Sequence, residues 1–200
     1  LAIFDLPDFR FSQQNVRTIG CNWKLIQDAF LDGYHVTRLH KNSVGAFFPD
    51  AISESESIGE HIRSAVARNE IYEAQDQPPE KLDLRRDATF SYTVFPNAIV
   101  IFHPDYTSII TLTPLSADET VFAHTMLTPQ EPASEKERDH FRRSFELFDQ
   151  GVFQAEDIFV SVSAQRGMRS GANEHLLFGA LEEAAIRFHD ILERALDQKV

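Results

Sequence analysis

Two histidines and an aspartate lie close together in the first quarter of this 200-residue chain, in the order Asp32, His35, His40. Asp32 and His35 are three residues apart, so on a helix they share a face and the carboxylate can form a hydrogen bond with the imidazole ring. A carboxylate in that place is the usual support of a metal-binding histidine. His35 and His40 are five residues apart, which turns them roughly 140° from each other on an ideal helix. They can bind one ion only if the helix ends or distorts between them, and Gly33 and β-branched Val36 favour a helix little.

This pair does not by itself define a metal site, because most histidines at a helix end are surface residues or satisfied core residues. The sequence contains no HExxH motif, which would be far more specific. A third ligand is available in the apolar segment FQAEDIFVSV, where Glu156 and Asp157 are adjacent. Periodicity does not choose between them, and a buried carboxylate needs a compensating cation. Two histidines and one carboxylate with open coordination positions are the facial triad of non-haem Fe(II) oxygenases.

The histidines follow a segment with the pattern of an amphipathic helix, NWKLIQDAFLDGY at residues 22–34. Its apolar residues recur at helical spacing, and Asn22 is suited to cap its N-terminus. The recurring apolar residues are Trp23, Ile26, Phe30 and Tyr34. The sequence therefore predicts a helix that leads directly to the candidate ligands.

The middle of the chain has the composition of β-strands, rich in Ile, Val, Phe, Tyr and Thr with partial alternation. The predicted strands cover residues 61–72, 90–95, 98–103, 106–113 and 119–127. The last two form a hairpin that turns between Pro114 and Asp118, and short turns between neighbouring strands imply an antiparallel sheet. Residues 74–88 are polar, contain Pro78-Pro79, and predict a loop.

A long helical pattern follows the strands and begins at Ser134, which forms a capping-box pair with Glu137. Its apolar residues are Phe141, Phe145, Phe148, Val152 and Phe159. Gly167 and Gly171 break the pattern, and a final amphipathic helix is predicted at about 179–197. We therefore predict an α+β fold in which a curved antiparallel sheet curls around the long C-terminal helix (a helix-grip, START-like domain) and leaves a cavity between them.

Composition and charge exclude several classes of protein. The net charge of −12 and the pI near 5.0 argue against nucleic-acid or anionic-membrane partners. No apolar run approaches the roughly 20 residues of a membrane-spanning helix, and the N-terminal residues do not resemble a signal peptide. A lone Cys21 indicates a reducing compartment, so we expect a cytoplasmic protein, and it cannot hold an iron–sulfur cluster. The length fits one domain, residues 1–200, and the missing initiator Met suggests a segment of a longer protein.

Three motifs, in order along the chain, resemble those of Rieske-type aromatic-ring-hydroxylating oxygenases. The segment NWKLIQDAFLDGYHVTRLH is similar to their iron-binding motif, in which Asn-Trp-Lys leads into a helix with Asp-x-x-His and a second His five residues later. The segment FQAEDIFVSVSAQRGMRSGA resembles their second motif, an acid–Asp pair followed by Gln-Arg-Gly. Between them, Phe95-Pro96-Asn97 opens a strand as in many members. The resemblance covers essentially the whole chain.

The resemblance implies that this chain is the C-terminal catalytic domain of the alpha (large terminal) subunit, without the Rieske [2Fe-2S] domain. It identifies His35, His40 and Asp157 as ligands of a mononuclear Fe(II), and Asp32 as the catalytic aspartate that bridges the iron and a Rieske cluster. The family usually has Glu-Asn where this chain has Gln27-Asp28, so an acid replaces an Asn that would face the open iron position.

The implied activity is the use of O₂ at this iron to hydroxylate an aromatic or other hydrophobic substrate, as in aromatic hydrocarbon catabolism. Electrons would come from the Rieske cluster of the same or a neighbouring subunit of a homotrimer, and ultimately from NADH through a separate reductase or ferredoxin. The chain alone would then be inactive. The same triad serves monooxygenases and O- or N-demethylases, and a metal-free carrier of hydrophobic ligands with this fold is a further alternative.

The residues next to the predicted ligands are candidates for the substrate pocket. Val36 adjoins His35, and Phe153 lies one helical turn before Asp157. Further pocket candidates, for which a place in the plain core is the simpler interpretation, are Phe47, Phe48 and His103.

Overall fold

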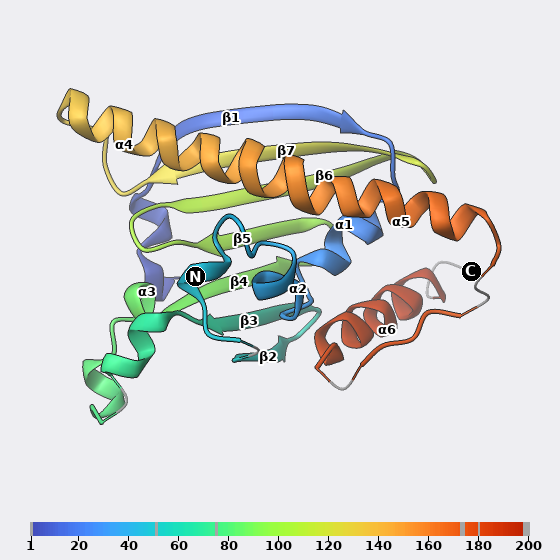
Figure 1. The fold of residues 1–200 in the computed structure, drawn as a ribbon, viewed down its shortest axis with the longest axis horizontal. Coiled ribbons are helices and arrows are strands. Elements are labelled where there is room, and N and C mark those ends of the chain that lie inside the picture. Colours follow the sequence, from blue (N-terminus) through green and yellow to red (C-terminus); the bar gives the residue numbers. More distant parts are fainter. Residues whose placement is uncertain (1, 51, 75, 173–174, 180, 198–200) are drawn as a thin grey trace.

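In the computed structural model, which describes residues 2–50, 52–74, 76–172, 175–179 and 181–197, a seven-stranded antiparallel sheet has the order β1-β7-β6-β5-β4-β3-β2. The strands are β1 (Arg10–Ile19), β2 (Ser53–Ile58), β3 (His61–Ala67), β4 (Ala88–Val94), β5 (Ala98–Phe102), β6 (Thr107–Ser116) and β7 (Glu119–Thr128). Figure 1 shows a long helix lying across one face of this sheet. The predicted α+β class, with a sheet packed on a long helix, is confirmed.

The long helix has three consecutive parts, α4 (Glu135–Glu146), a π-helix η6 (Leu147–Ile158) and α5 (Phe159–Arg169). The hydroxyl of Ser134 accepts a hydrogen bond from the Glu137 amide, as the capping pattern predicts. The helix continues through Gly167 and ends at Arg169, and Gly171 then adopts a φ of 68°, a conformation that glycine adopts most readily. A π-helix winds more widely than an α-helix and often marks a functional site.

The core between helix and sheet follows from the alternation of side chains along each strand. Phe122, Ile110 and Leu112 of β7 and β6 point toward the helix and are fully buried against Phe153 and its neighbours. The remaining buried members of this cluster are Ile19, Cys21, Ile26, Val44, Ile99, Ile101, Val152 and Ile158. Residues of the other parity on the central strands pack on the opposite face with Phe4. The central strands are therefore buried on both faces and fix the sheet beneath the helix.

The two edge strands were not predicted from the sequence. β1 (Arg10–Ile19) is polar and pairs with β7 at one edge, and β2 (Ser53–Ile58) alternates Ser and Glu at the other edge. Such strands lack the apolar alternation on which the prediction depends, because an edge strand with charged residues is protected from pairing with another chain.

Several predicted boundaries are wrong. The strand predicted at residues 61–72 ends at Ala67, and a 3₁₀ turn (Asn69–Glu73) follows. The loop predicted at residues 74–88 contains a 3₁₀ turn (Pro79–Lys81) and the one-turn α3 (Leu84–Asp87), which is capped by the Asp83 carboxylate. The last helix, α6, spans Glu183–Asp197, and residue 180 of the predicted range lies outside the described residues. Three further 3₁₀ turns cover Ala2–Phe4, Leu6–Asp8 and Gly45–Phe47.

Asp149 connects the long helix to strands β1 and β7 of the sheet through hydrogen bonds. It is 1% exposed, and its carboxylate accepts hydrogen bonds from Asn15 (2.7 Å), from both terminal nitrogens of Arg17 (2.9 and 3.0 Å) and from His124 Nδ1 (3.1 Å). Burial alone would raise the pKa of Asp149, but His124, Arg17 and Asn15 outweigh burial and hold this pKa well below its ordinary value.

We predict that Asp149→Ala lowers the free energy of unfolding by about 3 kcal/mol, because it leaves the partly buried Arg17 guanidinium and the buried His124 Nδ1 without their acceptor. Because the pKa of Asp149 is depressed in the folded chain, this stabilisation is present above the unfolded pKa of about 4 and is lost as the pH falls below it. Urea unfolding of the wild type and of the Asp149→Ala variant should therefore show a large difference in the free energy of unfolding at neutral pH. This difference should become smaller in acid. The control Asp139→Ala, at an exposed position on α4, should change little at either pH; an equal effect of both variants would contradict the prediction.

Candidate metal centre

The segment that carries the two histidines is built from two short helices joined by a turn. α1 (Trp23–Ala29) begins at Asn22, whose side chain accepts a hydrogen bond from the Lys24 amide at 3.0 Å. The helix predicted to continue to residue 34 ends at Ala29, because the chain turns there and restarts as the single turn of α2 (His35–Arg38). Gly33 lies in this turn, where an added Cβ would come within 2.6 Å of Ser53 Oγ. A larger residue at position 33 would therefore require the Ser53 hydroxyl of β2 to move away.

Asp32 precedes α2 and contacts His35 in a different way from the one predicted. Its main-chain carbonyl, not its carboxylate, accepts the hydrogen bond from His35 Nδ1, at 2.7 Å. The carboxylate accepts a hydrogen bond from the Tyr34 amide at 2.7 Å and lies 3.7 Å from His35 Nδ1. Burial raises the pKa of Asp32, but the nearby His35 ring and the Tyr34 amide lower it by more, so this pKa lies below its ordinary value.

The two histidine rings converge because α2 ends between them. His35 is the first residue of α2, and His40 lies beyond its last residue, Arg38. The ring centroids are 4.9 Å apart with an angle of 73° between the ring planes. The spacing of five residues required a helix that ends between the histidines, and α2 does end there.

Asp157 of the π-helix completes the group. Its Oδ1 lies 3.6 Å from His35 Nε2 and 3.3 Å from His40 Nε2, and one ligand atom from each of the three residues lies within 4.8 Å of the others. Asp157 is 3% exposed, and this oxygen has no hydrogen-bond partner among the described residues. A buried oxygen of this kind is costly unless a cation compensates it.

Glu156, which the sequence left equivalent to Asp157, has a separate place in the site. Its Oε2 accepts hydrogen bonds from His40 Nδ1 at 2.7 Å and from the Ser43 hydroxyl at 2.6 Å. Burial lowers the pKa of His40, but Asp157 and Glu156 outweigh burial and raise this pKa above its ordinary value. The adjacent acids therefore contact different nitrogens of His40: Glu156 contacts Nδ1 and Asp157 contacts Nε2.

The resulting donor set fits a divalent cation. Both Nδ1 atoms are engaged, one by the Asp32 carbonyl and one by the Glu156 carboxylate, so the Nε2 atoms of His35 and His40 are left to face Asp157 Oδ1. Partners at the outer nitrogen fix the tautomer and orientation of ligand histidines. Two imidazole nitrogens and one carboxylate oxygen on one side of an ion match a non-haem Fe(II) centre.

We predict that Glu156→Gln weakens Fe(II) binding about 10- to 100-fold, because loss of a partner that orients a ligand has effects of that size. Gln still fills the space but carries no charge opposite the His40 ring. Anaerobic titration of the chain with Fe(II) measures the change. Glu146→Gln, an exposed position on the same helix that pairs with Arg142, is the matched control. Unchanged affinity in the Glu156 variant would mean that this carboxylate does not support the metal.

A cavity of about 130 Å³ adjoins the three residues. Val36 and Phe153 line it, and so do Phe47, Phe48 and His103, for which plain core was the simpler interpretation. The other aromatic lining residues are Phe30 and Phe148, and the hydroxyl-bearing ones are Ser53, Ser55, Ser64, Thr89 and Ser91. The cavity therefore combines an aromatic part with a polar wall formed by β2, β3 and β4.

Asp28, the acid at the departure from the family pattern, does not line this cavity. Its carboxylate contacts Nε2 of His189 on α6 at 2.9 Å, and this contact raises the pKa of His189. The residue therefore connects α1 to the C-terminal helix.

Comparison with known proteins places this geometry in a family. Residues 6–198 match the family described as the ring hydroxylating alpha subunit (catalytic domain). The chain belongs to this family. Membership implies a mononuclear iron and a Rieske cluster, as the resemblance of the motifs indicated.

A similar protein in sequence is the chloroplastic choline monooxygenase of Arabidopsis thaliana, 26% identical over 183 residues. The alignment covers 90% of this chain and 40% of that protein. Among the described residues, no helix has the length and apolar character needed to cross a membrane.

Solved structures of Rieske oxygenases share the fold. The quaternary ammonium Rieske monooxygenase CntA, in complex with an inhibitor, has a TM-score of 0.73 at 16% identity, covering 94% of this chain and 50% of its own. Dicamba monooxygenase bound to 3,6-dichlorosalicylic acid gives 0.66 at 16% identity, with 96% and 61% covered. Naphthalene 1,2-dioxygenase from Rhodococcus sp. bound to indole gives 0.67 at 17% identity, with 93% and 56% covered. The chain thus spans about half the length of the structures that it matches.

Proposed function

We propose that this chain is the part of a Rieske-type oxygenase that holds a mononuclear Fe(II) on His35, His40 and Asp157 and oxidises a small substrate with O₂. One observation carries the proposal: the three ligand atoms lie within 4.8 Å of one another, and the carboxylate oxygen among them is buried without a partner. The iron, when bound, supplies the position at which O₂ is reduced.

The residues of the chain position the reactants around that ion. The Asp32 carbonyl and Glu156 hold the two imidazole rings, and the π-helix carries Asp157 at a buried position. Val36 and Phe153 line the adjoining cavity, where an apolar part of a substrate would exclude water from the ligands.

The electrons would come from a Rieske cluster outside these residues, because such a cluster needs two cysteines and the chain has only Cys21. We propose that the cluster belongs to another part of the same protein or to a neighbouring subunit of a homotrimer. Asp32 would link it to His35, and NADH would supply the electrons through a reductase.

A monooxygenase is favoured over a ring dioxygenase by the similarity to choline monooxygenase, the relative found in sequence. In that reaction one C–H bond, O₂, two electrons and two protons give an alcohol and water. If the new hydroxyl is on a methyl carbon bonded to oxygen or nitrogen, the product breaks down into formaldehyde and the demethylated alcohol or amine. Product analysis with ¹⁸O₂ separates the outcomes, since a dioxygenase places both labelled atoms in one product.

The proposal is tested by loading the purified chain with Fe(II) without oxygen, removing free metal, and measuring bound iron. About one iron per chain is expected, with three protein ligands and open positions detectable by spectroscopy. A metal-free carrier of hydrophobic ligands would bind apolar molecules in the cavity and retain no iron. That result would overturn the proposal.

A further inference from the structure

A second group of titratable residues lies beneath the cavity, apart from the metal ligands. Asp149, His124, Ser108 and His103 form a continuous hydrogen-bonded series. Asp149 Oδ1 is 3.1 Å from His124 Nδ1, His124 Nε2 is 3.0 Å from Ser108 Oγ, and Ser108 Oγ is 3.2 Å from His103 Nε2. All four residues are at least 96% buried.

The direction of every hydrogen bond in the series follows from the carboxylate at its end. The pKa of Asp149 is depressed, so its carboxylate is ionised and only accepts, and His124 must donate through Nδ1. A neutral His124 then has an unprotonated Nε2, which accepts the single hydroxyl proton of Ser108. The Ser108 oxygen can only accept from its other neighbour, so His103 carries its proton on Nε2.

Both histidines are neutral in this environment. Burial lowers the pKa of His103 well below its ordinary value, and the neighbouring His124, Arg68 and Arg85 lower it further. Burial also lowers the pKa of His124, and the opposing effect of Asp149 does not restore it. Each ring therefore has one protonated and one unprotonated nitrogen, and the unprotonated nitrogen of His103 is Nδ1.

Nδ1 is the ring nitrogen of His103 that is left for a ligand in the cavity. His103 is one of the cavity-lining residues, and its Nδ1 makes no hydrogen bond with any part of the chain that the structure describes. Asp157 Oδ1 is a fully enclosed polar atom without a hydrogen-bond partner, and His103 Nδ1 is not enclosed in this way. The ring is held by stacking on Tyr106 (centroids 4.2 Å apart) and by an edge contact with Phe148 (4.4 Å). Phe148 lies nine residues before Asp157 on the long helix, so the contact that holds the His103 ring is more than two helical turns from that candidate ligand.

We propose that His103 Nδ1 is a fixed hydrogen-bond acceptor that selects substrates with a donor group, a hydroxyl or an N–H, at the end directed away from the metal. The inference rests on the proposed function in taking this cavity as the substrate site. It assigns a specificity-determining role to His103, and positioning roles to Ser108, His124 and Asp149.

Two probes of equal shape test the acceptor. An engineered cavity of about 150 Å³ in another protein binds benzene, so phenol and toluene suit a cavity of about 130 Å³. Calorimetric titration of the metal-free full chain measures the affinity of each probe for the wild type and for the His103→Phe variant. The phenylalanine keeps an aromatic ring against Tyr106 and Phe148. We expect phenol to bind about tenfold more weakly to the variant, with less than about a twofold change for toluene. Equal changes for both probes would overturn the proposal.

Asp149→Asn tests the direction of the series. At the Oδ1 position an amide nitrogen faces one donor, from Arg17, whereas at the Oδ2 position it would face donors from both Arg17 and Asn15, so the nitrogen takes the Oδ1 position. It then donates to His124 Nδ1, which reverses each bond in turn and leaves His103 with a proton on Nδ1. Benzonitrile, which only accepts hydrogen bonds, should then gain about tenfold in affinity relative to phenol. A ratio unchanged in a folded variant would contradict the proposal.

The protonation of His103 can also be read without a ligand or a variant. Long-range ¹H–¹⁵N spectra of the metal-free chain should show the His103 proton on Nε2, and a proton on Nδ1 would overturn the proposal. None of these measurements needs iron. Selective phenol binding by a chain that retains no Fe(II) would support the role of His103 and refute the oxygenase function. Iron binding without selectivity for phenol would support the oxygenase function and refute the role of His103.

Discussion

Replacing His35, His40 or Asp157 by alanine should abolish the retention of Fe(II), lowering occupancy from about one iron per chain to a background level. In the proposed site each residue supplies one of the three protein ligands found among the described residues, so its loss leaves two ligands for the ion. Metal analysis after anaerobic loading and desalting measures the effect.

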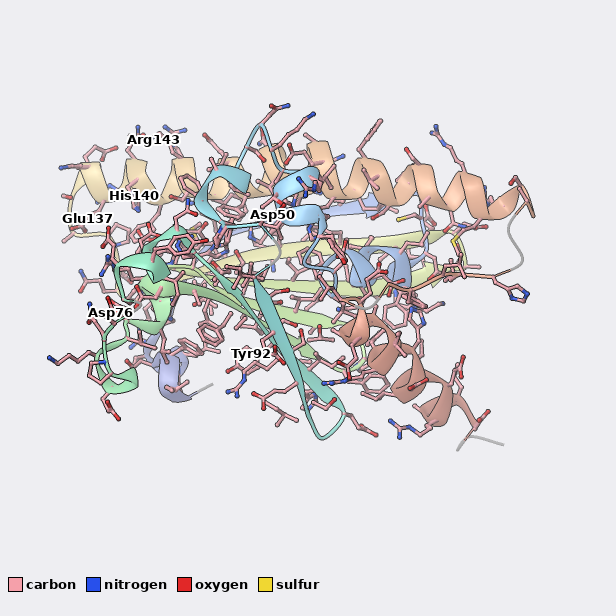
Figure 2. All side chains as sticks on the ribbon, turned by 60° about the horizontal axis from the view of Figure 1, so that its bottom comes forward. Asp50, Asp76, Tyr92, Glu137, His140 and Arg143 are labelled. Carbon is pink, nitrogen blue, oxygen red and sulfur yellow. The ribbon has the colours of Figure 1, made fainter. Side chains whose placement is uncertain are left out.

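The same variants should leave the metal-free fold intact. Asp157→Ala should not lower the stability of the metal-free chain, because it removes a buried carboxylate oxygen that has no hydrogen-bond partner in the described residues. His140→Ala is the matched control, since His140 lies near the far end of the long helix with Glu137 and Arg143 (Figure 2) and pairs there with Asp105. Iron retained by all three ligand variants at the level of this control would show that the site is elsewhere.

Asp32→Asn should slow electron transfer to the iron by orders of magnitude in the full-length enzyme, with iron and Rieske cluster both bound. In this structure the substitution removes the charge of Asp32 but keeps its hydrogen bonds. The hydrogen bond to His35 comes from the main-chain carbonyl and is unaffected, and an Asn oxygen can still accept from the Tyr34 amide. Asn and Asp cap a turn about equally well, so a change in stability below about 1 kcal/mol is expected.

Single-turnover kinetics provide the measurement. With substrate and O₂ added to the reduced enzyme, the cluster of the Asp32→Asn variant should stay reduced while that of the wild type is reoxidised. Asp105→Asn, an exposed carboxylate that contacts His140, should behave as wild type. Normal reoxidation in the Asp32 variant at full metal occupancy would assign the residue to structure alone.

The hairpin of β6 and β7, the long helix and the candidate ligands were predictable from sequence because each carries a strong local signal. Phe141, Phe145 and Val152 recur at helical spacing, and the strands alternate apolar residues at spacing two. The edge strands β1 and β2 were missed, because the residues Arg10–Ile19 and Ser53–Ile58 face solvent on much of their length and carry no such pattern.

The roles within the Glu156–Asp157 pair could not be separated by periodicity, because both acids have apolar neighbours at helical spacing. Their separation depends on the wide turn of the π-helix and on the place where α2 ends, which bring His40 between the two carboxylates. The contact between Asp32 and His35 was likewise misassigned, because a main-chain carbonyl is invisible to an argument from side-chain spacing.

The sequence by itself determined the fold class, the family and three residues able to bind a metal, since these depend on residue types and on distances of a few positions along the chain. Only the tertiary structure decided the series from Asp149 to His103. Its members come from the long helix, β7, β6 and the residue that follows β5, and sheet pairing with helix packing brings successive members within 3.2 Å of each other. Buried polar groups far apart in sequence carry no local pattern, because each is satisfied only by a partner that folding supplies.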